Sequence, residues 1–178
     1  MKQKILLFIG CMLVALGLQA QNVQTVTYAQ SSKSETIKLT SPAPANATVT
    51  FNNTYTSNKV QLTGGNSMTY TFSGFDGYTI TGITLSMRSN KSAGTGSLDV
   101  KVGKTTIASI ATATFKSSAW NGSYSQSYVD ITPAVTETLV KEGENLVITI
   151  AASVNSLYCQ SVTISYRGAS LVDEAALP

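Results

Sequence analysis

A cluster of aromatic and polar side chains in the second half of the chain has the residue types that bind a sugar. Trp120, Tyr124 and Tyr128 lie close together in the sequence, with Asn121 among them. Aromatic rings stack on the apolar faces of sugar rings, while planar amide and guanidinium groups bind the hydroxyl groups. The alternative is that Trp120 fills one open end of a sandwich as a core residue.

A second polar segment could supply hydrogen bonds to the same ligand. Arg88 lies near the end of a long strand predicted over 79–89, and Asn90 follows that strand directly; both side chains can donate hydrogen bonds to hydroxyl groups. We therefore predict a ligand-binding site with two stacking rings and three hydrogen-bonding side chains: Trp120, Tyr124, Arg88, Asn90 and Asn121.

Carboxylates are the other residues that could do chemistry. Two carboxyl groups about 5–10 Å apart can hydrolyse a glycosidic bond. None of the acidic residues lies in an apolar stretch of the kind that makes a carboxyl group a general acid. A carboxylate-based hydrolase is therefore the third-ranked function. The acids considered are Asp76, Asp99, Asp130, Glu137, Glu142 and Glu144.

Calcium is a possible ligand of this chain, because carboxylate and carbonyl oxygens at the edge of a jelly roll can bind it. The candidate ligands are Asp76, Asp130 and Glu144, and their spacing is not that of an EF-hand loop. Apart from calcium, we expect no cofactor.

The chain contains no histidine, which removes the commonest general base and the commonest transition-metal ligand. Cys159 lies in a strand-like run, where we expect a small buried side chain rather than a nucleophile. The Gly103–Thr105 segment resembles the end of a phosphate-binding loop, but Leu98 stands where that motif needs glycine. Gly103-Lys104 instead predicts a two-residue type II′ hairpin turn.

The first twenty residues predict export. Lys2 and Lys4 precede an apolar run over 5–18, which is the pattern of a cleavable signal peptide. The run is shorter than the roughly 20 residues of a membrane-spanning helix, so we expect no membrane span. We expect a secreted, periplasmic or cell-surface protein. Lipidation at Cys11 is a weaker alternative, because the apolar run before it is short.

Net charge excludes two classes of partner. Loss of residues 1–20 removes two lysines and leaves ten basic and nine acidic residues. A chain so close to neutral has no electrostatic footprint for nucleic acid, and it has no basic amphipathic stretch for a membrane surface.

Residue composition and periodicity predict an all-β fold. Thr, Ser, Val, Ile and Tyr are frequent, and apolar residues alternate with polar ones over 68–72 and 98–102. Ile80 is out of phase with Ile83, which predicts a β-bulge at Gly82. Residues 146–152 are apolar on both faces, as in a central strand.

Turn signals every 8–12 residues indicate eight to ten short strands, and hence an antiparallel β-sandwich that is jelly-roll-like. We divide the chain into four segments. Residues 1–20 form a signal peptide, and residues 21–46 form an N-terminal strand or linker whose packing the sequence pattern leaves open. Residues 47–167 form the β-sandwich domain, and residues 168–178 form a flexible tail.

Two stretches carry a family resemblance: TITGITLSMRSNKSAGTGSL at 79–98 and NSLYCQSVTISY at 155–166. They resemble β-sandwich modules of secreted proteins from gut-type Gram-negative anaerobes, some of which are attached to hydrolases. The resemblance covers about residues 47–167. It implies a jelly-roll-like sandwich in an accessory role, and it assigns no functional residue.

The favoured function is a secreted, non-catalytic binding module whose ligand is a glycan or another cell-surface polymer. The alternative is a structural or protein-interaction domain, such as an adhesin subunit or a hydrolase inhibitor. That alternative predicts a protein partner and an exposed edge strand or apolar patch.

Overall fold

The computed structural model describes residues 22–29, 34–38, 48–53, 61–89, 94–114 and 128–168. The regular elements of these residues are all β-strands, and no helix among them is long and apolar enough to cross a membrane. The strands are β1 (Gln24–Ala29), β2 (Ser34–Lys38), β3 (Thr48–Asn53), β4 (Gln61–Leu62), β5 (Ser67–Ser73), β6 (Tyr78–Ser89), β7 (Thr95–Val102), β8 (Thr105–Thr114), β9 (Val129–Ile131), β10 (Thr138–Leu139), β11 (Leu146–Val154) and β12 (Leu157–Gly168).

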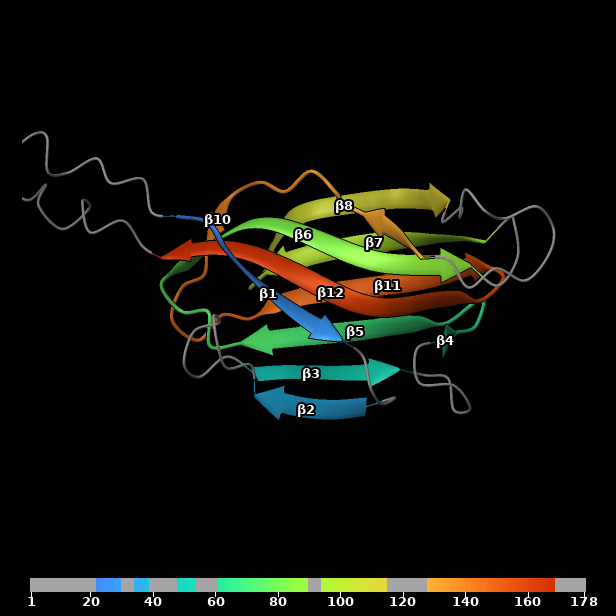
Figure 1. The fold of residues 1–178 in the computed structure, drawn as a ribbon, viewed down its shortest axis with the longest axis horizontal. Coiled ribbons are helices and arrows are strands. Elements are labelled where there is room, and N and C mark those ends of the chain that lie inside the picture. The colour runs from blue at the N-terminus through green and yellow to red at the C-terminus, as the bar shows by residue number, and fades with distance from the viewer. Residues whose placement is uncertain are drawn as a thin grey trace, which may run out of the picture.

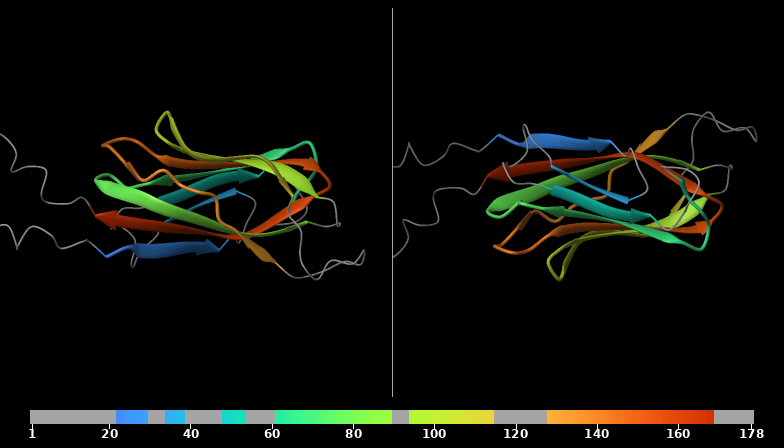
Figure 2. Two further views of the ribbon diagram at one scale, coloured as in Figure 1. Left: turned by 90° about the horizontal axis from the view of Figure 1, so that it is seen from above. Right: turned by 90° about the horizontal axis from the view of Figure 1, so that it is seen from below.

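The strands form two antiparallel sheets. Sheet A has the order β1-β12-β6-β10, with β4 also paired to β12 and β9 to β6, and sheet B has the order β2-β3-β5-β11-β7-β8. Sheet A lies in front of sheet B in Figure 1, and Figure 2 shows the two layers edge-on. The chain passes from β5 in sheet B to β6 in sheet A and back to β7, and later from β10 to β11 to β12. This alternation between sheets confirms the predicted antiparallel, jelly-roll-like sandwich.

The core lies between the sheets and follows the period-two pattern of the strands. In β5, Met68, Tyr70 and Phe72 are buried, while the threonines between them are only half-buried. β11 lies between β5 and β7, as the apolar character of residues 146–152 predicts for a central strand. Each fully buried aliphatic or aromatic side chain stabilises the fold by about 1.5–3 kcal/mol.

The N-terminal segment contributes to this core. β1 pairs with the last strand, β12, and its Val26 and Tyr28 side chains are buried. The Tyr28 ring makes edge contacts with Tyr70 and Phe72 of the other sheet. Residues 24–29 therefore belong to the sandwich rather than to a linker that leads into it.

Two local predictions from the sequence are confirmed. Ser165 pairs with Gly82 and Tyr166 pairs with Ile80, so Thr81 is the extra residue of a β-bulge. The bulge lets Ile80 and Ile83 both face the core, although they differ in phase. Gly103 connects β7 to β8 with φ of 56°, as the first residue of a type II′ turn requires.

Cys159 packs in the core and is fully buried. Burial raises the pKa of the Cys159 thiol to about 12, although hydrogen bonding to Tyr70 and to the backbone of Ser161 acts in the opposite direction. The thiol is therefore protonated at neutral pH and has no nucleophilic character. This environment agrees with the prediction of a buried structural cysteine.

The raised pKa of Cys159 predicts a pH-dependent stability. The unfolded thiol ionises near its ordinary pKa, whereas the folded thiol stays neutral until about pH 12. The folded state therefore has its full stability below the pKa of the unfolded thiol. Above that pKa the unfolded state gains free energy by ionising, so the free energy of unfolding decreases. The free energy of unfolding should fall by about 1 kcal/mol between about pH 7.5 and about pH 9.5. Urea unfolding at the two pH values measures the fall. Cys159→Ala should remove most of it, and an equal fall in that variant would contradict the assignment.

Candidate functional site

The buried polar side chains of the described residues gather at one end of the sandwich. Arg88, Ser89 and Ser156 have exposed fractions of 4%, 1% and 8%. β6 ends at Ser89 and β12 begins at Leu157, which is paired with Ser89. Burying a polar group costs free energy unless it is hydrogen-bonded, so this end of the sandwich is a place to look for a functional site.

Arg88 lies on the outward face of sheet A. Leu85 and Met87 of the same strand point into the core, and strand alternation turns Arg88 the other way. Tyr158 is paired with Arg88 and lies between the core residues Leu157 and Cys159, so it also faces outward.

Two tyrosine rings flank the guanidinium group of Arg88. Its Cζ atom lies 4.0 Å from the centroid of the Tyr158 ring and 5.2 Å from that of Tyr128. Cation–π contacts of this kind contribute about 0.5–2 kcal/mol, with the higher value for desolvated pairs. The contacts fix the plane of the guanidinium group and the orientation of both rings.

Strand pairing arranges these side chains in a row across sheet A. Gln61 of β4 pairs with Tyr158, and Tyr158 pairs with Arg88. Tyr128 directly precedes Val129, which pairs with Met87, so the chain places Tyr128 beside Arg88. We call Gln61, Tyr158, Arg88 and Tyr128 the Arg88 row. It combines two rings with one guanidinium and one amide group.

The outward face next to the Arg88 row is lined by small hydroxyl side chains. Thr27, Thr163 and Thr84 lie opposite one another on β1, β12 and β6. The Thr27 and Thr163 hydroxyl oxygens are 2.8 Å apart, and those of Thr84 and Thr132 are 3.2 Å apart. This part of sheet A therefore presents hydroxyl groups on the same face as the tyrosine rings.

Of the predicted ligand-binding residues, the structure places Arg88. Trp120, Tyr124, Asn90 and Asn121 lie outside the described residues, so their roles stay predictions. Tyr158 and Gln61 were missed, because only the pairing of β12 with β6 and β4 brings them beside Arg88. Tyr158 precedes Cys159 in a strand-like run, but no sequence signal gives its register.

The three calcium candidates do not form one cluster. Asp76 accepts a hydrogen bond of 2.9 Å from the Gly143 backbone, and Glu144 accepts one of 3.1 Å from the Lys141 backbone. Asp130 lies instead on β9, opposite Ser86 of β6. Within the described ranges, no group of three or more His, Cys, Asp or Glu side chains is placed to hold a metal ion.

Two of the remaining carboxylates have cationic partners at the surface. Asp99 forms an ion pair with Lys101 on β7, with an N–O distance of 2.8 Å, and Glu137 forms one with Arg167. All four side chains are exposed, so these pairs contribute at most about 1 kcal/mol each.

No protein-family model and no curated protein sequence matches the chain. Solved structures with a similar arrangement include a xylan-binding module, CBM15, with a TM-score of 0.45, 9% identity, and coverage of 83% of this chain and 99% of that one. The CBM36-1 domain of a multidomain xylanase from the hindgut metagenome of Trinervitermes trinervoides has a TM-score of 0.36, 16% identity, and coverage of 80% and 96%. CBM36 in complex with calcium and xylotriose has a TM-score of 0.35, 15% identity, and coverage of 79% and 98%. Because all three TM-scores are below 0.5, these similarities assign neither a family nor a ligand.

Close packing beside the Arg88 row depends on a glycine. Gly94 is buried, and a Cβ atom there would overlap the Ser89 side chain and lie 3.4 Å from Leu157 Cδ2. The backbone that leads into β7 therefore lies directly against the end of β6.

Gly94→Ala should lower the free energy of unfolding by about 1–3 kcal/mol, because the added methyl group forces the two segments apart. Urea unfolding measures the loss. Replacing Ser89 by glycine in the same chain makes room for the methyl group, so the double variant should be more stable than the sum of the single changes predicts. Wild-type stability of Gly94→Ala alone would contradict the packing.

Proposed function

We propose that this chain is a secreted, non-catalytic module that binds a glycan or another cell-surface polymer at the Arg88 end of sheet A. The observation that carries the proposal is the outward-facing guanidinium group of Arg88, held over the Tyr158 ring and beside the Tyr128 ring. Glycan binding requires rings for the apolar faces of the sugar and fixed donors for its hydroxyl groups.

Arg88 contributes to this site mainly as an anchor. Its exposed fraction is 4%, so most of the side chain is used to hold the two rings. A ring that is already held loses little conformational entropy on binding, which favours affinity. The half-buried Tyr128 and the hydroxyl groups of the adjacent threonines are the accessible part of the described surface.

Two of the other predicted ligand residues are close in the sequence to residues of the Arg88 row. Asn90 follows Arg88 by two residues, and Tyr124 precedes Tyr128 by four. In the proposed site Trp120 and Tyr124 stack on sugar rings, while Arg88, Asn90 and Asn121 donate hydrogen bonds. The Arg88 row is thus the fixed base of a site that these residues complete.

The proposal includes export and an accessory role. The pattern of residues 1–20 supports passage out of the cytoplasm by a cleaved signal peptide. The resemblance to secreted β-sandwich modules supports action alongside a secreted hydrolase rather than hydrolysis by this chain. The proposed module has no resident cofactor, and a calcium requirement is tested together with ligand binding.

The protein-interaction alternative receives less support from the edge of sheet B. β8 is an uncharged edge strand of ten residues, which would suit pairing with a partner strand. Its pairing with β7 shifts register twice, however, and the Thr136 backbone donates a hydrogen bond of 2.8 Å to the Ile107 carbonyl group. Bulges and a covering segment both hinder the addition of another strand.

A glycan array tests the proposal, with the protein applied with and without calcium. Trp120→Ala and Arg88→Lys should each weaken binding about tenfold or more, since one removes a stacking ring and the other the planar group between the tyrosines. Arg167→Lys is the matched control, because Arg167 is exposed and its partner is Glu137. Thermal melting of each variant checks folding. Unchanged binding by folded Trp120→Ala would reject the proposed site, and the absence of any glycan signal would favour a protein partner.

A further inference from the structure

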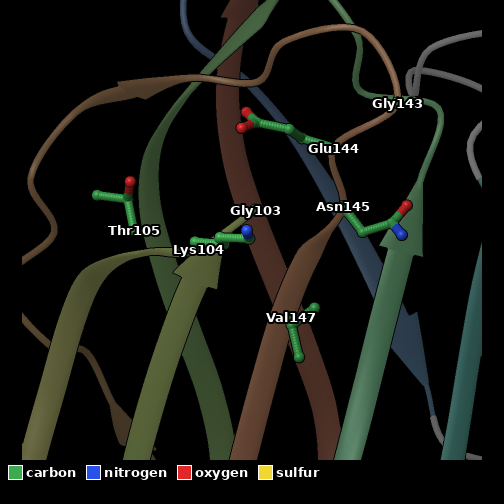
Figure 3. Close-up of a pocket in the computed structure, with 7 residues that line it drawn as sticks. All are labelled: Gly103, Lys104, Thr105, Gly143, Glu144, Asn145 and Val147. Carbon is green, nitrogen blue, oxygen red and sulfur yellow. The ribbon is translucent and has the colours of Figure 1, made fainter.

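A pocket of about 370 Å³ lies at the opposite end of the sandwich from the Arg88 row. Figure 3 shows its lining: Lys104 lies in the β7–β8 turn and Thr105 begins β8, while Glu144 and Asn145 lead into β11 and Val147 is the second residue of that strand. The lining combines an ammonium, a carboxylate, an amide and a hydroxyl group with one apolar side chain.

The backbone around this pocket is held by hydrogen bonds between two turns. The Gly103 N–H donates to the Asn145 carbonyl group at 3.0 Å, which joins the β7–β8 turn to the start of β11. The Gly143 N–H donates to Asp76 Oδ1 at 2.9 Å, which joins the same segment to the turn before β6. Gly103 and Gly143 both have positive φ, so side chains at either position would strain the turns. The pocket is therefore preorganised by the fold.

The Glu144 carboxylate is hydrogen-bonded to this frame. Its Oε2 atom accepts a hydrogen bond of 3.1 Å from the Lys141 backbone. A Cβ atom at position 103 would lie 2.6 Å from Glu144 Oε1. Any residue other than glycine there would therefore displace the Glu144 carboxylate. Oε2 is engaged with the turn, and Oε1 lies at the Gly103 side of the pocket, where it can accept a hydrogen bond from a ligand.

The charges of the lining restrict the ligand. Lys104 and Glu144 have opposite charges, and the ion pairs within the described ranges join other residues, Lys101 with Asp99 and Arg167 with Glu137. An anion would face the Glu144 carboxylate, and a cation would face the Lys104 ammonium group. An apolar ligand would leave the polar lining without hydrogen bonds. A neutral molecule with several hydroxyl groups fits all of these groups, and Val147 can contact the apolar face of its ring.

We propose that this pocket is a second carbohydrate subsite, which takes a neutral sugar residue. Glu144 and Asn145 bind adjacent hydroxyl groups, Lys104 donates to another, and Val147 contacts the ring. The proposal rests on the proposed function for its ligand class, but it uses none of the residues of the Arg88 row.

The two sites are too far apart for one short oligosaccharide. β6 starts beside the turn that binds Gly143 and ends at the Arg88 row, and its twelve residues span about 36 Å. Arg88 also faces outward from sheet A, whereas Val147 lies between the core residues Leu146 and Ile148 and faces outward from sheet B. Two neighbouring chains of a polysaccharide could occupy the two sites. Simultaneous binding would then raise the apparent affinity for a polymer above that of either site alone.

Backbone amide NMR tests the subsite with the protein from Gln21 onward, titrated with cellohexaose, xylohexaose and mannohexaose. Glycine and glucuronic acid serve as zwitterionic and anionic probes. At least one neutral hexasaccharide should shift the amide signals of Gly103, Lys104, Glu144 and Asn145. Glu144→Gln should weaken that response about fivefold, because the amide keeps the bond to Lys141 but lacks the charge.

Glu142→Gln is the matched control, since Glu142 lies in the same turn but does not line the pocket. Its titration should equal that of the wild type. The subsite is rejected if no neutral hexasaccharide shifts these signals, if glycine alone does so, or if the two glutamine variants respond equally. Arg88→Lys separates the two proposals, because it should weaken the response near Arg88 about tenfold or more and leave that of the pocket unchanged. A pocket response with no response near Arg88 in the wild type would reject the first site and support the second.

Discussion

The antiparallel pairing of β6 with β12 is the constraint on which the rest of this structure depends. The pairing runs from Leu157 with Ser89 to Gly168 with Tyr78, and β12 also binds β1 and β4. A slip of one residue would turn every side chain to the other face. In the strand that slipped, it would bury the outward hydroxyl groups and expose the core residues.

Two bulges in this pairing keep the apolar side chains of both strands pointing into the core. Gln160 is the extra residue between Cys159 and Ser161, and it lets Cys159 and Val162 both point into the core although they differ in phase. Thr81 does the same for Ile80 and Ile83 on β6. The bulge at Gln160 shifts the alternation of side chains between the two parts of β12. Cys159 can therefore point into the core while Tyr158 points outward and pairs with Arg88. The packing of the core and the geometry of the Arg88 row thus come from one irregularity.

The interior supports the two sites without taking part in their chemistry. It is filled by aliphatic and aromatic side chains, and its cysteine is kept neutral by burial. The side chains suited to ligands lie instead at the two ends, where strands finish and turns begin. There the backbone has hydrogen-bonding groups that a sheet does not use, and glycines allow close approach, as at Gly94 and Gly103. A rigid sandwich can therefore hold polar groups in fixed positions at both ends.

The sequence by itself determined the fold class, the central position of β11, the bulge near Gly82 and the turn at Gly103. These features depend on local alternation and on backbone angles that few residues adopt. It also singled out Arg88, because a guanidinium group can donate hydrogen bonds to the hydroxyl groups of a sugar. Only the tertiary structure decided that Tyr158 and Gln61 join it, that Asp130 lies apart from Asp76 and Glu144, and that Lys104 and Glu144 line one pocket. The physical reason is that these contacts join residues far apart in the chain, through strand register and turn packing that no local pattern encodes.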